Sequence, residues 1–123
     1  MTQSPYKGKT GISRIIKAFG YSAQGCISAW KYEDAFRMEV AVAMIAIPLA
    51  LWLPVGNIRK ALLVSSILLV MIVELVNSAI EATVDRISLD NHELAKRAKD
   101  IGSFAVLMSL INAAVIWVLV IWG

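Results

Sequence analysis

The chain has 123 residues, 59% of them hydrophobic, with 12 basic and 9 acidic residues and a formal net charge of +3. Soluble domains usually contain about 45–50% apolar residues, so the composition argues against a soluble globular protein. A single cysteine, Cys26, excludes an intrachain disulfide and a metal site made of several cysteines.

The N-terminal residues 1–11 are polar and lack the pattern of a signal peptide. Apolar and basic positions then intermingle in a way that predicts an amphipathic surface helix at about residues 13–32. Three apolar segments follow and predict membrane spans at about 38–55, 58–88 and 100–122. The apolar runs within them, at 38–55, 61–80 and 101–122, are each close to the ~20 residues needed to cross a hydrocarbon core of about 30 Å. The predicted fold is an all-α membrane protein, a single unit over residues 1–123, with three transmembrane helices and a surface helix.

The basic residues indicate the orientation of these spans. Six of the twelve precede the first span, four lie between the second and the third, and two lie in the first hairpin. Because cytoplasmic loops are enriched in Lys and Arg, this distribution predicts a cytoplasmic N-terminus and a C-terminus on the outer side. The positive charge is then explained by topology and by contact with anionic lipid, and we expect no nucleic-acid partner.

The second span carries polar residues where hydrocarbon is expected. Glu74, Asn77, Glu81 and Asp85 follow the spacing i, i+3, i+7, i+11 and share one face of a helix. A carboxylate in hydrocarbon costs at least ~2.5 kcal/mol, so this stripe requires partners, water or a metal. At ~1.5 Å per residue, Glu74 lies roughly 20 Å from the outer end of the span at Ala61. Such a position is near the inner boundary, where a lipid headgroup and a cytosolic solute can both reach it.

The third span carries small residues at intervals along one face, at Gly102, Ala105, Ser109 and Ala113. Small side chains in such a stripe allow two helix backbones to approach closely. We therefore expect this face to pack against another helix.

Further acidic residues, Glu33 and Glu39, lie near the same interface as the stripe. Such ligands suit Mg²⁺, which binds one or two carboxylates together with phosphate oxygens and water. The basic residues that could meet phosphates are Arg14, Lys17, Lys96, Arg97 and Lys99. Together these groups are the components of a phosphoryl-transfer site. The alternative is a structural role, in which the stripe pairs with Arg37, Arg86 or Lys99 between helices.

The segment Glu74-x-x-Asn77-Ser78-Ala79-Ile80-Glu81-x-x-x-Asp85 closely resembles the signature of the prokaryotic integral-membrane diacylglycerol kinases. The likeness continues in the same order over nearly the whole chain. It includes Arg14-Ile15-Ile16-Lys17-Ala18, Gly20-Tyr21-Ser22, Ala35-Phe36-Arg37-x-Glu39, His92-Glu93-Leu94 and Arg97-Ala98-Lys99-Asp100-x-Gly102-Ser103. Ala23 and Asp90-Asn91 depart from the family pattern, on the lipid side and the adenine side respectively.

The resemblance implies a homotrimer in the bacterial inner membrane, with the C-terminus in the periplasm. It implies transfer of the γ-phosphoryl group of MgATP to the hydroxyl of diacylglycerol, which gives phosphatidic acid for phospholipid recycling. The implied cofactor is Mg²⁺, and the implied substrates are ATP and diacylglycerol.

By motif position, the resemblance makes Glu74 the general base and Asn77 a residue that orients the catalytic groups. It places the metal on Glu33 and Glu81. The nucleotide-binding residues that it implies are Arg14, Tyr21, Glu33, Glu81, His92, Lys99 and Asp100. The lipid-binding residues that it implies are Arg14, Trp30, Phe36, Arg37, Glu39, Trp52, Glu74, Ser103 and Trp117. Asp85 is left with a supporting or structural role.

Two alternatives remain open. The same chemistry could act on undecaprenol, which some relatives of this fold prefer. From another class, the chain could be a small transporter or structural subunit whose acidic stripe binds a cation or a proton. A transmembrane ion path usually has polar groups through the whole depth, whereas residues 61–73 supply only Ser65 and Ser66.

Overall fold

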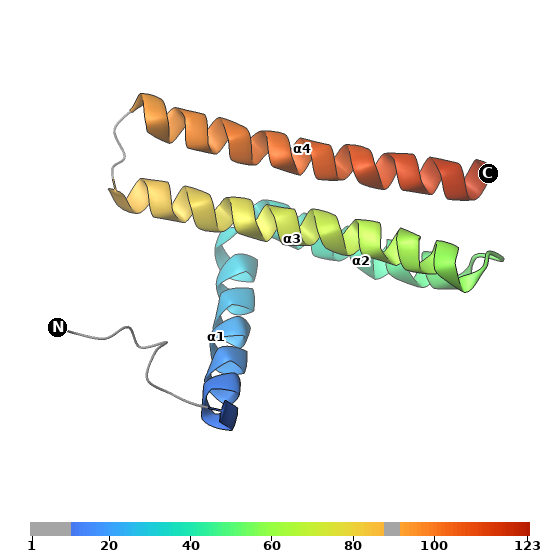
Figure 1. Cartoon of the computed structure of the whole chain (residues 1–123), viewed down its shortest axis with the longest axis horizontal. Helices are drawn as coiled ribbons and strands as arrows, with labels where there is room; N and C mark the ends of the chain where they lie inside the picture. The colour runs from blue at the N-terminus through green and yellow to red at the C-terminus, as the bar shows by residue number, and fades with distance from the viewer. Residues whose placement is uncertain (1–10, 88–91) are drawn as a thin grey trace.

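The computed structural model describes residues 11–87 and 92–123. These residues form four α-helices and no strand: α1 (Gly11–Tyr32), α2 (Asp34–Trp52), α3 (Asn57–Ile87) and α4 (Glu93–Trp122). Helices α2, α3 and α4 run alongside one another, and α1 lies crosswise to them (Figure 1). Helices α2, α3 and α4 are each long and apolar enough to cross a membrane. The predicted all-α class with three apolar spans is therefore confirmed.

The helices extend beyond the apolar segments at some ends and stop short of them at others. Helix α2 begins at Asp34 rather than near residue 38, and α4 begins at Glu93 rather than near residue 100. Polar side chains stabilise the added turn at the start of α4, where Lys96 Nζ donates to Asp100 Oδ2, one turn further along, at 2.7 Å. Helix α2 ends at Trp52, before Pro54, because a residue that precedes proline is disfavoured in the helical conformation.

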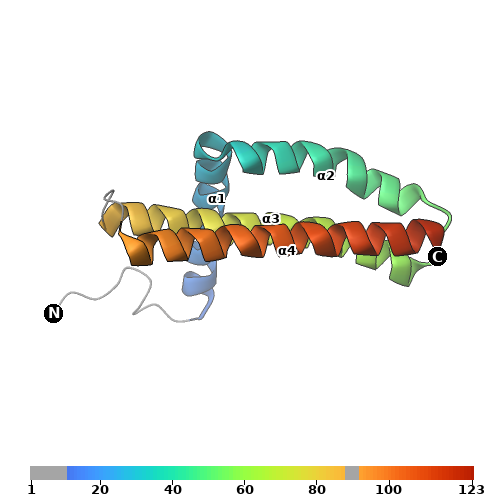
Figure 2. The same cartoon turned by 90° about the horizontal axis from the view of Figure 1, so that it is seen from above.

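Helix α3 is the central element, because it packs against both α4, which lies beside it in Figure 1, and α2, which is seen apart from α4 in Figure 2. Its buried residues, Leu63, Ser66, Val70 and Asn77, follow a helical spacing and so form one continuous face. The apolar core, made of Ala50, Leu63 and Val120 and the side chains around them, lies near the α2–α3 turn. Most other large apolar side chains are exposed, as suits helices whose outer faces meet acyl chains rather than water.

The small-residue face of α4 packs only in part as predicted. Gly102 and Ser109 are buried and Ala113 is half-buried, but Ala105 is exposed. The half-buried neighbour Val106 lies on the packed side instead, so the face that contacts α3 is turned toward Val106 and away from Ala105.

A polar link joins α3 to α4 within the apolar region. Trp117 Nε1–H donates to Ser66 Oγ at 3.0 Å, and Ser66 Oγ donates to the Leu63 carbonyl oxygen at 2.7 Å. Ser66 is 1% exposed, so its hydroxyl has no access to water in place of these partners. The link satisfies both groups where an unpaired polar group would be costly.

We predict that Ser66→Ala lowers the stability of the folded protein in detergent by about 1 kcal/mol, because Trp117 loses its acceptor. Thermal unfolding followed by circular dichroism measures the change. The matched control is Ser65→Ala, since the neighbouring Ser65 is exposed. Equal shifts in the two variants would contradict a specific role for the link.

Candidate functional site

The corner between α1 and α2 positions Glu33. This residue has an extended backbone, with φ −115° and ψ 104°, and its side chain makes no capping hydrogen bond to α2. Arg37 holds the corner from the next turn: Nη1–H donates to the Trp30 carbonyl at 2.6 Å and to the Lys31 carbonyl at 3.2 Å. Its Nη2 pairs with Asp34. The Arg37 guanidinium thus donates hydrogen bonds to backbone carbonyls at the end of α1. The Glu33 carboxylate takes no part in capping this corner.

Four carboxylates approach one another where α2 and α3 meet this corner. Glu74 on α3 interacts electrostatically with Glu33 and Glu81, and also with Glu39 on α2. All four side chains are half-buried. Within residues 11–87 and 92–123, no Lys, Arg or His forms an ion pair with any of them. We call Glu33, Glu39, Glu74 and Glu81 the acidic cluster.

The residues of the polar stripe on α3 differ in their hydrogen-bond and ion-pair partners. Asn77 is 7% exposed, and its Nδ2 donates to Glu81 Oε1 at 3.2 Å. One turn further, Asp85 Oδ1 accepts from Lys99 Nζ of α4 at 2.7 Å. The structural interpretation therefore holds for Asp85, which joins two helices as an ion pair. Glu74 and Glu81 form no ion pair in the described part of the chain, although Lys99 lies near enough to Glu81 to interact with it electrostatically.

A largely apolar cleft of about 680 Å³ opens beside the acidic cluster, between α1 and α3. Glu33 and Phe36 contribute to it at the corner, and Phe36 is 6% exposed. The other lining residues come from the second half of α1 and from α3: Ser22, Gly25, Cys26, Ser28, Ala29, Tyr32, Leu75, Ser78, Ala79 and Ala82. An apolar wall beside carboxylates suits a ligand that has both an apolar chain and a polar end.

The donor set of the acidic cluster fits a hard divalent cation. Glu33 and Glu81 offer carboxylate oxygens that form no ion pair with a described cation. No group of three or more His, Cys, Asp or Glu residues in the described ranges is arranged to enclose a metal. Mg²⁺ needs no such enclosure, because it commonly binds one or two carboxylates and completes its shell with water and substrate phosphates.

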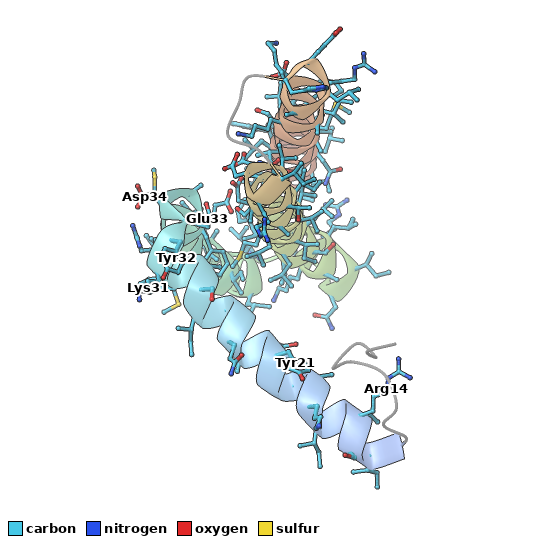
Figure 3. The ribbon with its side chains drawn as sticks, turned by 90° about the vertical axis from the view of Figure 1, so that its left-hand side faces the viewer. Arg14, Tyr21, Lys31, Tyr32, Glu33 and Asp34 are labelled. Carbon is cyan, nitrogen blue, oxygen red and sulfur yellow. The ribbon has the colours of Figure 1, made fainter. Side chains whose placement is uncertain are left out.

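The nucleotide-binding residues predicted on α1 lie apart from the cluster. Figure 3 places Arg14 and Tyr21 on the half of α1 that extends away from the long helices, whereas Glu33 lies at the junction. Both side chains are exposed. This chain alone therefore does not bring Arg14 and Tyr21 to Glu81.

The nucleotide-binding residues predicted on α4 gather at its start. His92 occupies the N-cap position, and its Nδ1 accepts a hydrogen bond from the Leu94 backbone N–H at 3.0 Å, which leaves Nε2 as the second polar atom of the ring. Asp100 accepts from Lys96, and Lys99 is paired with Asp85 as described above. These residues are exposed or half-buried and lie where the cytosolic end of α4 is predicted.

Five of the nine predicted lipid-binding residues fall into two groups. Phe36, Arg37 and Glu39 lie at the acidic cluster or its corner, and the Arg37 guanidinium is committed to the helix junction. Trp52 and Trp117 lie toward the opposite end of the long helices, near the α2–α3 turn. Trp30 and Ser103 are exposed on α1 and α4, respectively.

The sequence did not predict the contacts of Arg37 at the α1–α2 corner, and it did not predict that Lys99 pairs specifically with Asp85. A basic residue just after a helix break is a signal for capping of the preceding helix, and it could have identified Arg37. Asp90 and Asn91, where the sequence departs from the family pattern, lie outside the described residues.

The chain is similar to known proteins over most of its length. A family model described as prokaryotic diacylglycerol kinase matches residues 20–121. The chain belongs to this family. The diacylglycerol kinase of Escherichia coli (strain K12) is 53% identical over 114 residues, which cover 93% of each chain. Those of Pseudomonas aeruginosa and Haemophilus influenzae are each 47% identical, over 100% and 88% of this chain and 100% and 92% of their own. The resemblance noted in the sequence is thereby confirmed.

We predict that Arg37→Lys loosens the α1–α2 corner, because an ammonium group cannot reach two carbonyls and a carboxylate as the guanidinium fork does. The expected cost is about 1 kcal/mol for each hydrogen bond lost. Hydrogen–deuterium exchange should be faster in peptides that cover residues 28–36. Asp34→Asn, which removes only an exposed ion pair, is the control and should change exchange little. Unchanged exchange in Arg37→Lys would refute the role given to this residue.

Proposed function

We propose that this chain is an ATP-dependent diacylglycerol kinase, which transfers the γ-phosphoryl group of MgATP to the hydroxyl of diacylglycerol and gives phosphatidic acid for phospholipid recycling. The observation that carries the proposal is the acidic cluster, four carboxylates that form no ion pair with a described residue, beside a cleft at one end of three apolar helices. Membership of the prokaryotic diacylglycerol kinase family supports the choice of substrate.

Glu74 is the general base of the proposed reaction. It takes the proton of the lipid hydroxyl as that oxygen forms a bond to the γ-phosphorus, while the bond from phosphorus to the bridging oxygen breaks and ADP leaves. Its half-buried position on α3, within electrostatic reach of Glu33 and Glu81, supports this role. Asn77 supports the site by donating to Glu81.

Glu33 and Glu81 hold Mg²⁺ in this proposal. When bound, the cation neutralises the charge of the nucleotide phosphates and of the transferred group. The two residues come from the α1–α2 corner and from α3, so the backbone arrangement of the corner determines their separation. The uncommitted side chain of Glu33 supports this role, because a capping hydrogen bond would occupy the oxygen needed for the metal.

We further propose a homotrimer with α1 lying at the cytoplasmic membrane surface. The support is the separation of Arg14 and Tyr21 from the acidic cluster within one chain, since a neighbouring subunit could bring the equivalent residues to it. The distribution of basic residues supports a cytoplasmic N-terminus and a periplasmic C-terminus in the bacterial inner membrane. On this arrangement His92, Lys99 and Asp100 face the nucleotide from the cytosol.

The direct test is phosphoryl transfer by the purified full-length chain in vesicles, with radiolabelled ATP and either diacylglycerol or undecaprenol. We expect label in phosphatidic acid, and no transfer after chelation of divalent cations. Preferential labelling of undecaprenol would favour the related kinase activity. Cation flux without any lipid phosphorylation would refute the kinase proposal and favour a transporter.

We predict that Glu74→Gln lowers the turnover number at least about 100-fold while the protein stays folded, because the amide cannot accept the hydroxyl proton. Initial rates at saturating ATP and lipid measure the effect, with circular dichroism as the check of folding. Glu93→Gln is the control, since this exposed acidic residue begins α4 and lies outside the acidic cluster. Substantial activity in Glu74→Gln would remove Glu74 from the role of base.

A further inference from the structure

Gly102 on α4 makes an unusually close contact with α3. A Cβ atom at this position would overlap Asn77 Oδ1 and would lie 3.2 Å from Asn77 Cγ. Gly20, Gly25 and Gly56 have nothing within 4 Å of an added Cβ. Glycine within a helix is less stable than alanine, so the position requires a reason. The reason here is space, because any side chain would displace the Asn77 amide or separate the two helices.

The two ends of the Asn77 amide have different surroundings. Nδ2 donates to Glu81 Oε1 at 3.2 Å, whereas Oδ1 is buried and has no hydrogen-bond partner among the described residues. Oδ1 faces Gly102, the position at which an added Cβ would overlap it. The α4 backbone therefore lies against the carbonyl oxygen of the amide, and the amino group is directed at Glu81. Unpartnered buried oxygens are rare, and this one is held in place by packing rather than by a hydrogen bond.

We propose that Gly102 is a positioning residue for phosphoryl transfer. By having no side chain, it holds the Asn77 amide in the orientation that donates to Glu81, and so fixes the Glu81 carboxylate for the divalent cation. This inference rests on the proposed metal-binding role of Glu81. A methyl group at position 102 rotates the amide or moves α4 away, and either change breaks a hydrogen bond that is already long.

The first test compares Gly102→Ala with wild type in the full-length protein, with transfer rates measured over a range of Mg²⁺ concentrations. We expect the apparent Mg²⁺ affinity to fall about 10- to 100-fold, as is typical when a residue supporting a metal ligand is disturbed. Gly56→Ala is the control, because a Cβ there meets nothing within 4 Å. A wild-type Mg²⁺ dependence in Gly102→Ala overturns the inference, whereas an inactive wild-type protein refutes the proposed function instead.

The second test separates positioning through Asn77 from general helix packing. Thermal unfolding and Mg²⁺ dependence are measured for Gly102→Ala, Asn77→Ala and the double variant. Because Asn77→Ala removes the atoms that the new methyl would meet, Gly102→Ala should add no further loss in that background. If Gly102→Ala alone does not fold, the double variant should fold. Equal losses in both backgrounds, or failure of both proteins to fold, overturn the inference.

Discussion

The burial of four carboxylates close to one another is the constraint on which the rest of this structure depends. Glu74 lies within electrostatic reach of Glu33, Glu39 and Glu81 where α1, α2 and α3 meet, and no described Lys, Arg or His forms an ion pair with any of the four. Folding cannot favour such a group by charge, so the surrounding packing must hold it. The Arg37 corner, the α2–α3 contact and the close approach of α4 supply that support, and a divalent cation with nucleotide phosphates would complete the charge balance.

A single face of α3 serves both the packing and the proposed chemistry. Toward the α2–α3 turn this face buries Leu63, Ser66 and Val70, and toward the other end it buries Asn77. The polar residues of the site therefore continue the register of the apolar core, so their positions are fixed by the same helix contacts. This arrangement explains how a chain with few polar groups near the α2–α3 turn can present a defined site toward the other end of α3.

The sequence was sufficient to predict the helices and the acidic stripe, because hydropathy and helical spacing are local properties of the chain. It also named Lys99 among three cations that could pair with the stripe. It did not reveal that Asp85 is the residue with which Lys99 pairs, or that Gly102 contacts the Asn77 amide, since both depend on how closely α3 and α4 approach. The separation of Arg14 from Glu81 likewise follows from the crosswise direction of α1, which no local pattern encodes.

The central claim is that Glu33 and Glu81 bind a divalent cation together with nucleotide. It is tested most directly by titrating Mn²⁺, as a replacement for Mg²⁺, into the purified protein with a non-hydrolysable ATP analogue, with free Mn²⁺ followed by electron paramagnetic resonance. We predict saturable binding in wild type and in Glu93→Gln, weakened about tenfold or more in Glu33→Gln and in Glu81→Gln. The same affinity in all four proteins would contradict the account.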